Sequence, residues 1–226
     1  MKRRMPHLAW LAAICLLPGL LATPVPAADT PTTAVAIVRG DDPNVMVARA
    51  IELLGGIRRF VRPGQSVVLK PNLTYCHGPD KPLPGMTTDV RVVAGVVRAI
   101  QAGMDCNITI AESSGKPTIK MFDVYGYADL AKRRGLNLVD LDDAARVAAS
   151  ADGLHIDCYQ LPRLTRQADV MIDCPVLKTH QLSGITVGMK NYYGLLAKPR
   201  AHYHEAVNEV LADLAMLQKT DLIVVD

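Results

Sequence analysis

Short apolar runs, rich in β-branched residues, alternate along this chain with stretches whose apolar positions recur at helical spacing. Residues 35–38, 67–69, 108–111 and 136–141 form four such runs, most of them bounded by polar or turn-forming residues. Continuous apolar runs of this length are typical of strands buried on both faces of a parallel sheet. We therefore predict a strand at each of these four positions.

Helical periodicity fills the intervals between these strands. Asp42-Pro43-Asn44 begins a helix that Gly55-Gly56 ends, Thr87-Thr88-Asp89 begins a second over residues 92–100, and a third covers about 127–134 before Gly135. Asp and Thr favour helix N-caps, and Gly favours the position after a helix. Strands that alternate with helices predict an α/β fold, a three-layer domain with a mostly parallel sheet and helices on both faces.

The second half of the chain is less regular. Residues 156–161 and 168–173 resemble strands, a helix is predicted from about 203 to 218, and 222–225 form a last strand. The segment 184–196 fits helix and loop equally well. Because the sequence ends directly after a strand that the pattern would bury, we expect residues 28–226 to be a single α/β domain that is incomplete at its C-terminus.

The first residues have the pattern of a secretory signal peptide. Lys2, Arg3 and Arg4 precede an apolar stretch over residues 8–22, and Val25-Pro26-Ala27 supplies a cleavage pattern of small residues. An uncleaved anchor is the alternative, but the apolar stretch is short for a membrane span and contains Pro18. We expect residues 1–27 to be removed, so that the mature protein begins at Ala28 or Asp29 and is exported, periplasmic or extracellular.

Removal of this peptide changes the charge balance. The formal net charge of the chain is +3, and residues 1–28 contribute three basic residues and no acid. The remaining chain is therefore near neutral, which argues against nucleic acid as a partner. No other apolar stretch is long enough for a membrane span, so we expect no stable span after cleavage.

Three lysines stand at or near the ends of apolar runs, each inside a short polar signature. They are Lys70 in Lys-Pro-Asn-Leu, Lys178 in Lys-Thr-His, and Lys190 in Met-Lys-Asn-Tyr-Tyr. Ligands of open α/β sheets bind at the carboxyl ends of the strands, and several ammonium groups gathered there suit an anion. The alternative is that the lysines extend to solvent while their stems cover the sheet rim. If they converge on one crevice, we expect a small anionic molecule as the partner.

Further polar residues follow the same strand ends. We predict ligand-binding roles for Lys70, Asn72, Thr88, Ser113, Lys178, Thr179, Lys190 and Asn191, and catalytic roles in proton transfer for Glu112 and His180. Simpler interpretations exist for several of these residues. Thr88 and Asp89 could serve merely as helix caps, without contacting a ligand. Glu112 could merely form a salt bridge with a nearby lysine, without a catalytic role. His180 and His204 could ligate a metal with Glu112 or Asp226, but two lone histidines are weak evidence and we assign no metal site.

The cysteines do not reveal a cofactor. Cys76, Cys106, Cys158 and Cys174 follow the signal peptide, and none of their spacings is a CxxC. The sequence therefore contains no readable iron–sulfur or zinc motif, and the cofactor is unknown. Four cysteines in an oxidising compartment permit two disulfides, but Cys106 and Cys158 lie beside apolar positions and are interpreted as small core residues.

An ordered series of motifs resembles the family catalogued as domain of unknown function 362. The motifs are Lys70-Pro71-Asn72-Leu73, Thr87-Thr88-Asp89, Ala111-Glu112-Ser113-Ser114-Gly115, Phe122 with Gly126-Tyr127, Val139-Asp140-Leu141, Ala168-Asp169-Val170, Pro175-Val176-Leu177-Lys178-Thr179-His180, Met189-Lys190-Asn191 with Gly194, and His204. The resemblance implies no settled reaction. Some members carry ferredoxin-type cysteine runs, which this sequence lacks. The family domain usually continues past a strand such as 222–226, which agrees with the expected truncation.

Three functions are compatible with these residues. The first is an exported enzyme that acts on a small anionic substrate held by the lysines, with His180 or Glu112 transferring a proton. The second is a binding protein that captures the anion without chemistry. The third is a metal- or redox-linked protein that uses His180, His204, Cys76 or Cys174.

Overall fold

The computed structural model describes residues 33–74, 85–115 and 117–226. Contacts divide the chain between Ala34 and Val35, and the following description concerns the unit from Val35 to Asp226. The predicted signal peptide and Cys76 lie outside the described residues.

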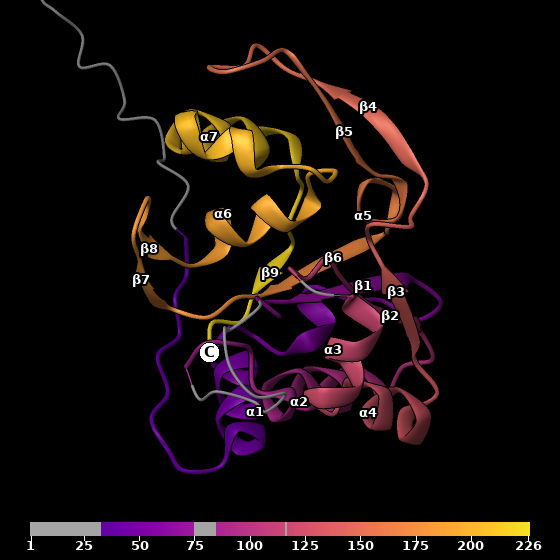
Figure 1. Ribbon diagram of the computed structural model, residues 1–226. Coiled ribbons are helices and arrows are strands. Elements are labelled where there is room, and N and C mark those ends of the chain that lie inside the picture. Colours follow the sequence, from indigo (N-terminus) through magenta and orange to yellow (C-terminus); the bar gives the residue numbers. More distant parts are fainter. Residues whose placement is uncertain (1–32, 75–84, 116) are drawn as a thin grey trace, which may run out of the picture. The chain divides into compact units, whose positions relative to one another are not determined.

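A five-stranded parallel sheet forms the centre of this unit (Figure 1). Its strands are β1 (Ser66–Pro71), β2 (Asn107–Glu112), β3 (Asn137–Asp140), β6 (Val170–Cys174) and β9 (Leu222–Ile223). They lie in the order β3-β2-β1-β6-β9, and each neighbouring pair is parallel. The predicted strands at 67–69, 108–111, 136–141, 168–173 and 222–225 correspond to these five.

Side chains of the central strands alternate between two apolar clusters, one on each face of the sheet. Val67 and Leu69 belong to one cluster, whereas Val68 between them belongs to the other. Successive side chains of a strand point to opposite faces, so a strand buried on both sides must be apolar throughout. The α/β fold with helices on both faces is therefore confirmed.

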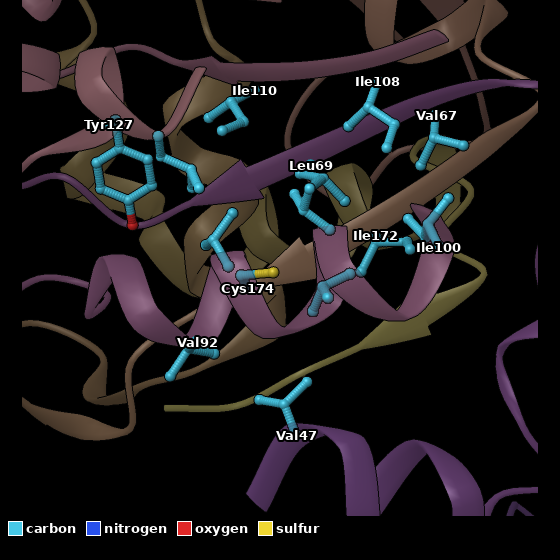
Figure 2. Close-up of a cluster of buried hydrophobic side chains, with 14 of the residues drawn as sticks. Val47, Val67, Leu69, Val92, Ile100, Ile108, Ile110, Tyr127, Ile172 and Cys174 are labelled. Atoms are coloured by element: carbon cyan, nitrogen blue, oxygen red, sulfur yellow. The ribbon is translucent and has the colours of Figure 1, made fainter. Parts of the chain in front are cut away.

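Different helices cover the two faces (Figure 1). The first face carries α1 (Pro43–Leu53), α2 (Val90–Gln101), α3 (Thr118–Val124) and α4 (Tyr127–Arg134). The second carries α6 (Gly188–Asn191), the 3₁₀ turn η2 (Tyr192–Leu195) and α7 (Val207–Leu217). Figure 2 shows the cluster of the first face, where Val92 and Ile100 of α2 lie among strand residues such as Leu69 and Ile172.

The first helices begin and end where the sequence predicts. The side chain of Asp42 accepts a hydrogen bond from the Asn44 amide at the start of α1, and Asp89 caps α2 through the Arg91 amide. Gly135 follows α4 with a φ of 66°, a left-handed conformation that glycine adopts without steric cost. These local signals work because each satisfies backbone groups that the helix itself leaves unpaired.

Two strand predictions need correction. Residues 35–38 form no strand, and Val35 and Ile37 are 78% and 90% exposed, because no strand in the described part of the chain pairs with them. The predicted strand at 156–161 is β5 (Cys158–Pro162), which pairs antiparallel with β4 (Arg146–Ser150) outside the main sheet. On this hairpin Cys158 is exposed and is not a core residue, while Cys106 is partly buried.

Most of the remaining elements follow β6. Lys178–His180 and Gly184–Thr186 form the antiparallel hairpin β7–β8, and the ambiguous segment 184–196 contains β8, α6 and η2 in succession. The predicted helix at 203–218 is a 3₁₀ segment, η3 (Ala201–Ala206), followed by α7. Two short helical segments complete the list, η1 (Ile57–Arg59) and α5 (Arg163–Gln167).

The strand order places a crevice beside β1. The chain passes from β1 to β2 and β3 on one side, and then crosses to β6 and β9 on the other. Where the strand order reverses, the loops that leave neighbouring strands diverge, and open α/β sheets bind ligands at that point. A ligand-binding site is therefore expected at the carboxyl ends of β1 and β6.

Candidate functional site

A cavity of about 450 Å³ lies next to the carboxyl ends of β1 and β6, and the β7–β8 hairpin forms part of its lining. Its described lining consists of Asn72, Thr74, Met86, Pro175, Val176, Lys178, Thr179, His180, Gln181, Leu182, Thr186, Val187, Lys190, Asn191 and His204. Six of the predicted site residues are thus brought together: Asn72, Lys178, Thr179, His180, Lys190 and Asn191. The other four, Lys70, Thr88, Glu112 and Ser113, lie outside this lining.

Two ammonium groups belong to the cavity. Lys178 of β7 donates to Asn72 Oδ1 at 2.8 Å and to the Met86 carbonyl. Lys190 of α6 lies over the ring of Tyr193, 4.1 Å from its centroid. Burial, together with the nearby charges of Arg200, Lys178 and Lys70, lowers the pKa of Lys190 to about 8. Lys190 is therefore charged at neutral pH, in surroundings that disfavour its charge.

His180 is held at the cavity by its own turn. Its Nδ1 accepts the backbone N–H groups of Leu182 and Ser183, each at 3.2 Å. Burial lowers the pKa of His180, and the charge of Lys190 acts in the same direction. An Nδ1 that accepts two hydrogen bonds carries no proton, so neutral His180 has its proton on Nε2 and is a donor there. Its predicted role in proton transfer stays a prediction, and its accepting nitrogen is already occupied.

Lys70 and Glu112 form an ion pair beneath the cavity. Lys70 Nζ lies 2.9 Å from both carboxylate oxygens of Glu112, and the two side chains are 0% and 3% exposed. Burial of a charge is costly unless an opposite charge compensates it, and here each residue does so for the other. Lys70 thus lies outside the cavity lining, although its charge acts on Lys190, and its predicted ligand-binding role stays a prediction. The salt-bridge alternative for Glu112 is realised, and its catalytic role stays untested.

Asn191 connects the cavity with this buried pair. Its Oδ1 accepts from Lys70 Nζ at 3.3 Å and from Asn72 Nδ2 at 3.2 Å, while its Nδ2 donates to Asp173 Oδ1 at 2.6 Å. Because Asn72 in turn accepts from Lys178, a continuous series of hydrogen bonds runs from the cavity to the interior. Movement of one member would therefore disturb the others.

Asp173 is a buried acid that the sequence-based selection omits. It lies on β6 opposite Lys70 of β1, is fully buried, and its Oδ2 has no hydrogen-bond partner in the described part of the protein. Burial raises its pKa to about 7, against the opposing effect of Lys70. The rule that predicts Lys70, a polar residue at the carboxyl end of an apolar strand, applies equally to Asp173 and would have found it.

Thr88 and Ser113 have structural contacts beside the cavity. The Thr88 hydroxyl accepts the Asn72 amide and donates to the Cys174 carbonyl, so that it links the ends of β1 and β6. Ser113 donates to Asp142 and accepts from Arg200. Both side chains are buried and engaged, and their predicted ligand contacts would require them to exchange these partners.

The residues proposed for metal or redox chemistry are not grouped as a metal centre. His180 and His204 both line the cavity, with ring centroids 6.3 Å apart. Cys174 is fully buried in the core shown in Figure 2, and burial raises the pKa of its thiol. Among residues 33–74, 85–115 and 117–226, no cluster of three or more His, Cys, Asp or Glu side chains is arranged to hold a metal ion.

Comparison with known proteins identifies the family. A family model described as "Domain of unknown function (DUF362)" matches residues 67–226, the region that contains the sheet, the buried ion pair and the cavity. The chain belongs to the DUF362 family. The resemblance carried by the ordered motifs is thereby confirmed, and every residue of the described cavity lies within the matched region.

A thylakoid-associated protein of Synechocystis sp. is one curated relative of this DUF362 chain. It is 30% identical over 193 residues, which cover 78% of this chain and 56% of that protein. The chain therefore spans little more than half the length of this relative, so what the whole relative does is not transferred to it. Within the described residues, no helix is both long enough and apolar enough to cross a membrane.

One solved structure resembles this member of DUF362 in fold, and a second was matched more weakly. A structural-genomics target from Thermotoga maritima has a TM-score of 0.52 at 11% identity, covering 76% of this chain and 44% of that one. The lactate racemase apoprotein from Thermoanaerobacterium thermosaccharolyticum has a TM-score of 0.48 at 15% identity, covering 69% and 37%. At 11% identity the likeness to the Thermotoga maritima structure concerns the fold alone.

Proposed function

We propose that this DUF362 protein binds a small anionic molecule in the cavity beside β1 and β6. One observation carries the proposal: Lys190 is a partly buried ammonium group that faces the cavity among other positive charges, with its pKa lowered to about 8. Within the described part of the chain it makes no ion pair. An anion in the cavity would supply the missing counter-charge and relieve the repulsion.

The other donors of the cavity support the same ligand class. Lys178 contributes a second ammonium group, and the Nε2–H of His180 is a neutral donor. A carboxylate or phosphate has several acceptor oxygens, which such a set of donors can satisfy from different directions. The volume of about 450 Å³ is in the range of small-molecule sites and is far too small for a folded partner.

The buried ion pair supports the proposal indirectly. Glu112 is fully engaged by Lys70 and also accepts the Ser113 amide at 2.7 Å, so its charge is not directed at the cavity. Glu112 therefore does not neutralise the positive charges of Lys178 and Lys190 in the cavity lining. The N-terminal pattern of Lys2 to Ala27 supports export of this binding protein to the periplasm or the exterior.

Calorimetric titration with succinate and with inorganic phosphate tests the proposal. Lys190→Met and Lys178→Met keep most of the side-chain stem and remove the charge, so each should weaken binding of at least one probe about tenfold or more. Lys132→Met, on the exposed end of α4, is the matched control and should bind like the parent. Parent protein that binds neither probe, or Lys190→Met protein that binds both unchanged, would refute the proposal.

A further inference from the structure

His180 and His204 form a pair across the cavity whose ring nitrogens have opposite properties. His180 ends β7 and His204 lies in η3, yet their rings are stacked with an interplanar angle of 18°. Both line the cavity. The hydrogen bonds at the two Nδ1 atoms determine what each Nε2 can do.

The first histidine is a donor. Nδ1 of His180 accepts the amides of Leu182 and Ser183, which leaves the ring proton on Nε2. In the described part of the chain, this Nε2 makes no hydrogen bond. The donor is therefore free to meet an acceptor atom in the cavity.

The second histidine has the opposite tautomer. The Tyr193 hydroxyl is in close contact with the Arg200 carbonyl and lies 3.0 Å from His204 Nδ1. A carbonyl oxygen can only accept, so the single phenolic proton must lie between Tyr193 and Arg200. His204 Nδ1 then has to donate to the Tyr193 oxygen, so its Nε2 carries the lone pair and can accept a hydrogen bond.

The charges around the pair keep both rings neutral. Lys190 and Arg200 lie near His204, and Lys190 and Lys178 lie near His180. Burial lowers the pKa of each histidine and Lys190 adds to the effect, while a hydrogen bond with the Ala201 backbone acts oppositely on His204. At neutral pH the two tautomers therefore persist as one donor and one acceptor.

We infer that the ligand is an anion that also carries a hydroxyl group, which donates to His204 Nε2. The inference rests on the proposed anion binding and narrows its ligand class. Lys190 and Lys178 would hold the anionic oxygens, and His180 Nε2–H would donate to an acceptor of the ligand. His204 Nε2 is an acceptor in a cavity otherwise rich in donors, and a plain carboxylate such as succinate, which carries no O–H group, cannot satisfy it. Tyr193 is a positioning residue, because it determines which nitrogen of His204 carries the proton.

Nuclear magnetic resonance tests the tautomers without any ligand. Long-range ¹⁵N–¹H correlation spectra at pH 7.5 should show His180 protonated at Nε2 and His204 at Nδ1, with signals assigned from His180→Gln and His204→Gln spectra. Tyr193→Phe should leave His180 unchanged and convert His204 to a mixture of tautomers. A parent spectrum in which His204 carries its proton on Nε2 would overturn the inference.

Matched ligands test the hydroxyl preference. The parent protein should bind malate about tenfold more tightly than succinate, and glycolate more tightly than acetate, the gain expected of one good hydrogen bond. His204→Phe should lose the preference for malate over succinate, and Tyr193→Phe should reduce it. His202→Phe is the control, since His202 is an exposed residue of the same turn and does not line the cavity.

The outcomes separate the two proposals. Succinate binding that depends on Lys190 but is equal to malate binding would overturn the hydroxyl inference and leave anion binding intact. A preference for malate that survives in folded His204→Phe protein would also overturn it. Absence of any binding in the parent protein would remove both proposals.

Discussion

At the scale of single residues, Asp173 is a carboxyl group whose negative charge is disfavoured by its buried surroundings. Its carboxyl is fully buried, and although Asn191 donates to its Oδ1, its Oδ2 has no hydrogen-bond partner in the described part of the chain. Lys70 lies on the neighbouring strand but is already engaged by Glu112. One ammonium group between two carboxylates leaves one negative charge uncompensated, and protonation of Asp173 removes it.

We predict that Asp173→Asn stabilises the protein above pH 7. The carboxyl has a native pKa of about 7 and an ordinary value of 3.8, so the native state binds the proton more tightly than the unfolded state. Stability from this group is full below pH 4 and is lost as the pH rises to about 7. The uncharged Asn avoids the loss, which should be about 2 to 4 kcal/mol between pH 4 and pH 8. Urea unfolding at several pH values measures the difference.

The control for this prediction is Asp213→Asn, which should show the opposite sign. Asp213 is also buried, but hydrogen bonds from the Leu154 amide and the Tyr159 hydroxyl outweigh burial and lower its pKa. Its stability contribution is present above the unfolded pKa and is lost as the pH falls through the native one. Parallel curves of stability against pH for the parent and Asp173→Asn would contradict the prediction.

Residue chemistry at strand ends could be predicted from the sequence, whereas the partners could not. Lys178 and Lys190 reach the cavity as expected, because both belong to elements that begin near the carboxyl end of β6. Lys70 has the same sequence context but points to Glu112 of the neighbouring strand. Only the register of the sheet decides between these environments, and register depends on residues distant in the chain.

At the scale of elements, the close contact between α1 and α2 depends on a glycine. A Cβ atom added to Gly95 would lie 2.9 Å from Val47 Cβ and 3.1 Å from its Cγ1. Both helices cover the same face of the sheet, and Val47 is visible on α1 opposite α2 in Figure 2. The backbone of α2 can approach α1 only because position 95 has no side chain.

Gly95→Ala is therefore expected to destabilise the protein by about 1 to 3 kcal/mol. Alanine favours a helix interior over glycine by about 1 kcal/mol, but the overlap with Val47 should exceed this gain. Thermal unfolding measures the effect, and Val47→Ala, which removes the Cγ1 contact but keeps Cβ, should destabilise the Gly95→Ala protein less than it destabilises the parent. A single variant more stable than the parent would show that the helices simply move apart.

Elements with their own local signals were predictable, and those defined by their partners were not. Helices α1, α2 and α4 have caps or terminal glycines that act within a few residues. Strand β4 has no comparable signal, since Arg146–Ser150 becomes a strand by pairing with β5. Residues 35–38 show the converse, an apolar run that pairs with no described strand and stays extended and exposed.

At the scale of the whole molecule, the cavity is assembled by the order of the strands. Asn72 follows β1, Lys178 and His180 belong to β7, Lys190 to α6 and His204 to η3. These segments meet because β1 and β6 are neighbours at the point where the order of strand addition reverses. Sequence analysis could place a site at the strand ends, but the stacking of His204 on His180 requires the full fold.

The charge of this assembled site predicts how anion affinity depends on pH. Lys190 is protonated below its pKa of about 8 and contributes fully to binding there. As the pH rises through 8 the ammonium group is lost, so affinity should fall by up to tenfold per pH unit. Succinate, whose charge is constant from pH 6.5 to 9.5, is the appropriate probe for calorimetry. Lys190→Met should bind more weakly and show a flatter profile, and an unchanged decline in that variant would assign the titration to another group.

The ion pair between Lys70 and Glu112 also limits how DUF362 lineages can diverge. Loss of one charge strands the other in the interior at a cost of about 3 to 5 kcal/mol, a large part of the stability of an ordinary domain. A side chain at Gly194 would press on both, since its Cβ would lie 2.9 Å from Glu112 Oε1 and 3.0 Å from Lys70 Nζ. A substitution at any one of positions 70, 112 and 194 should therefore be destabilising. We expect the three residues to be conserved together in related proteins, and a relative that lacks one of them to differ at the other two as well.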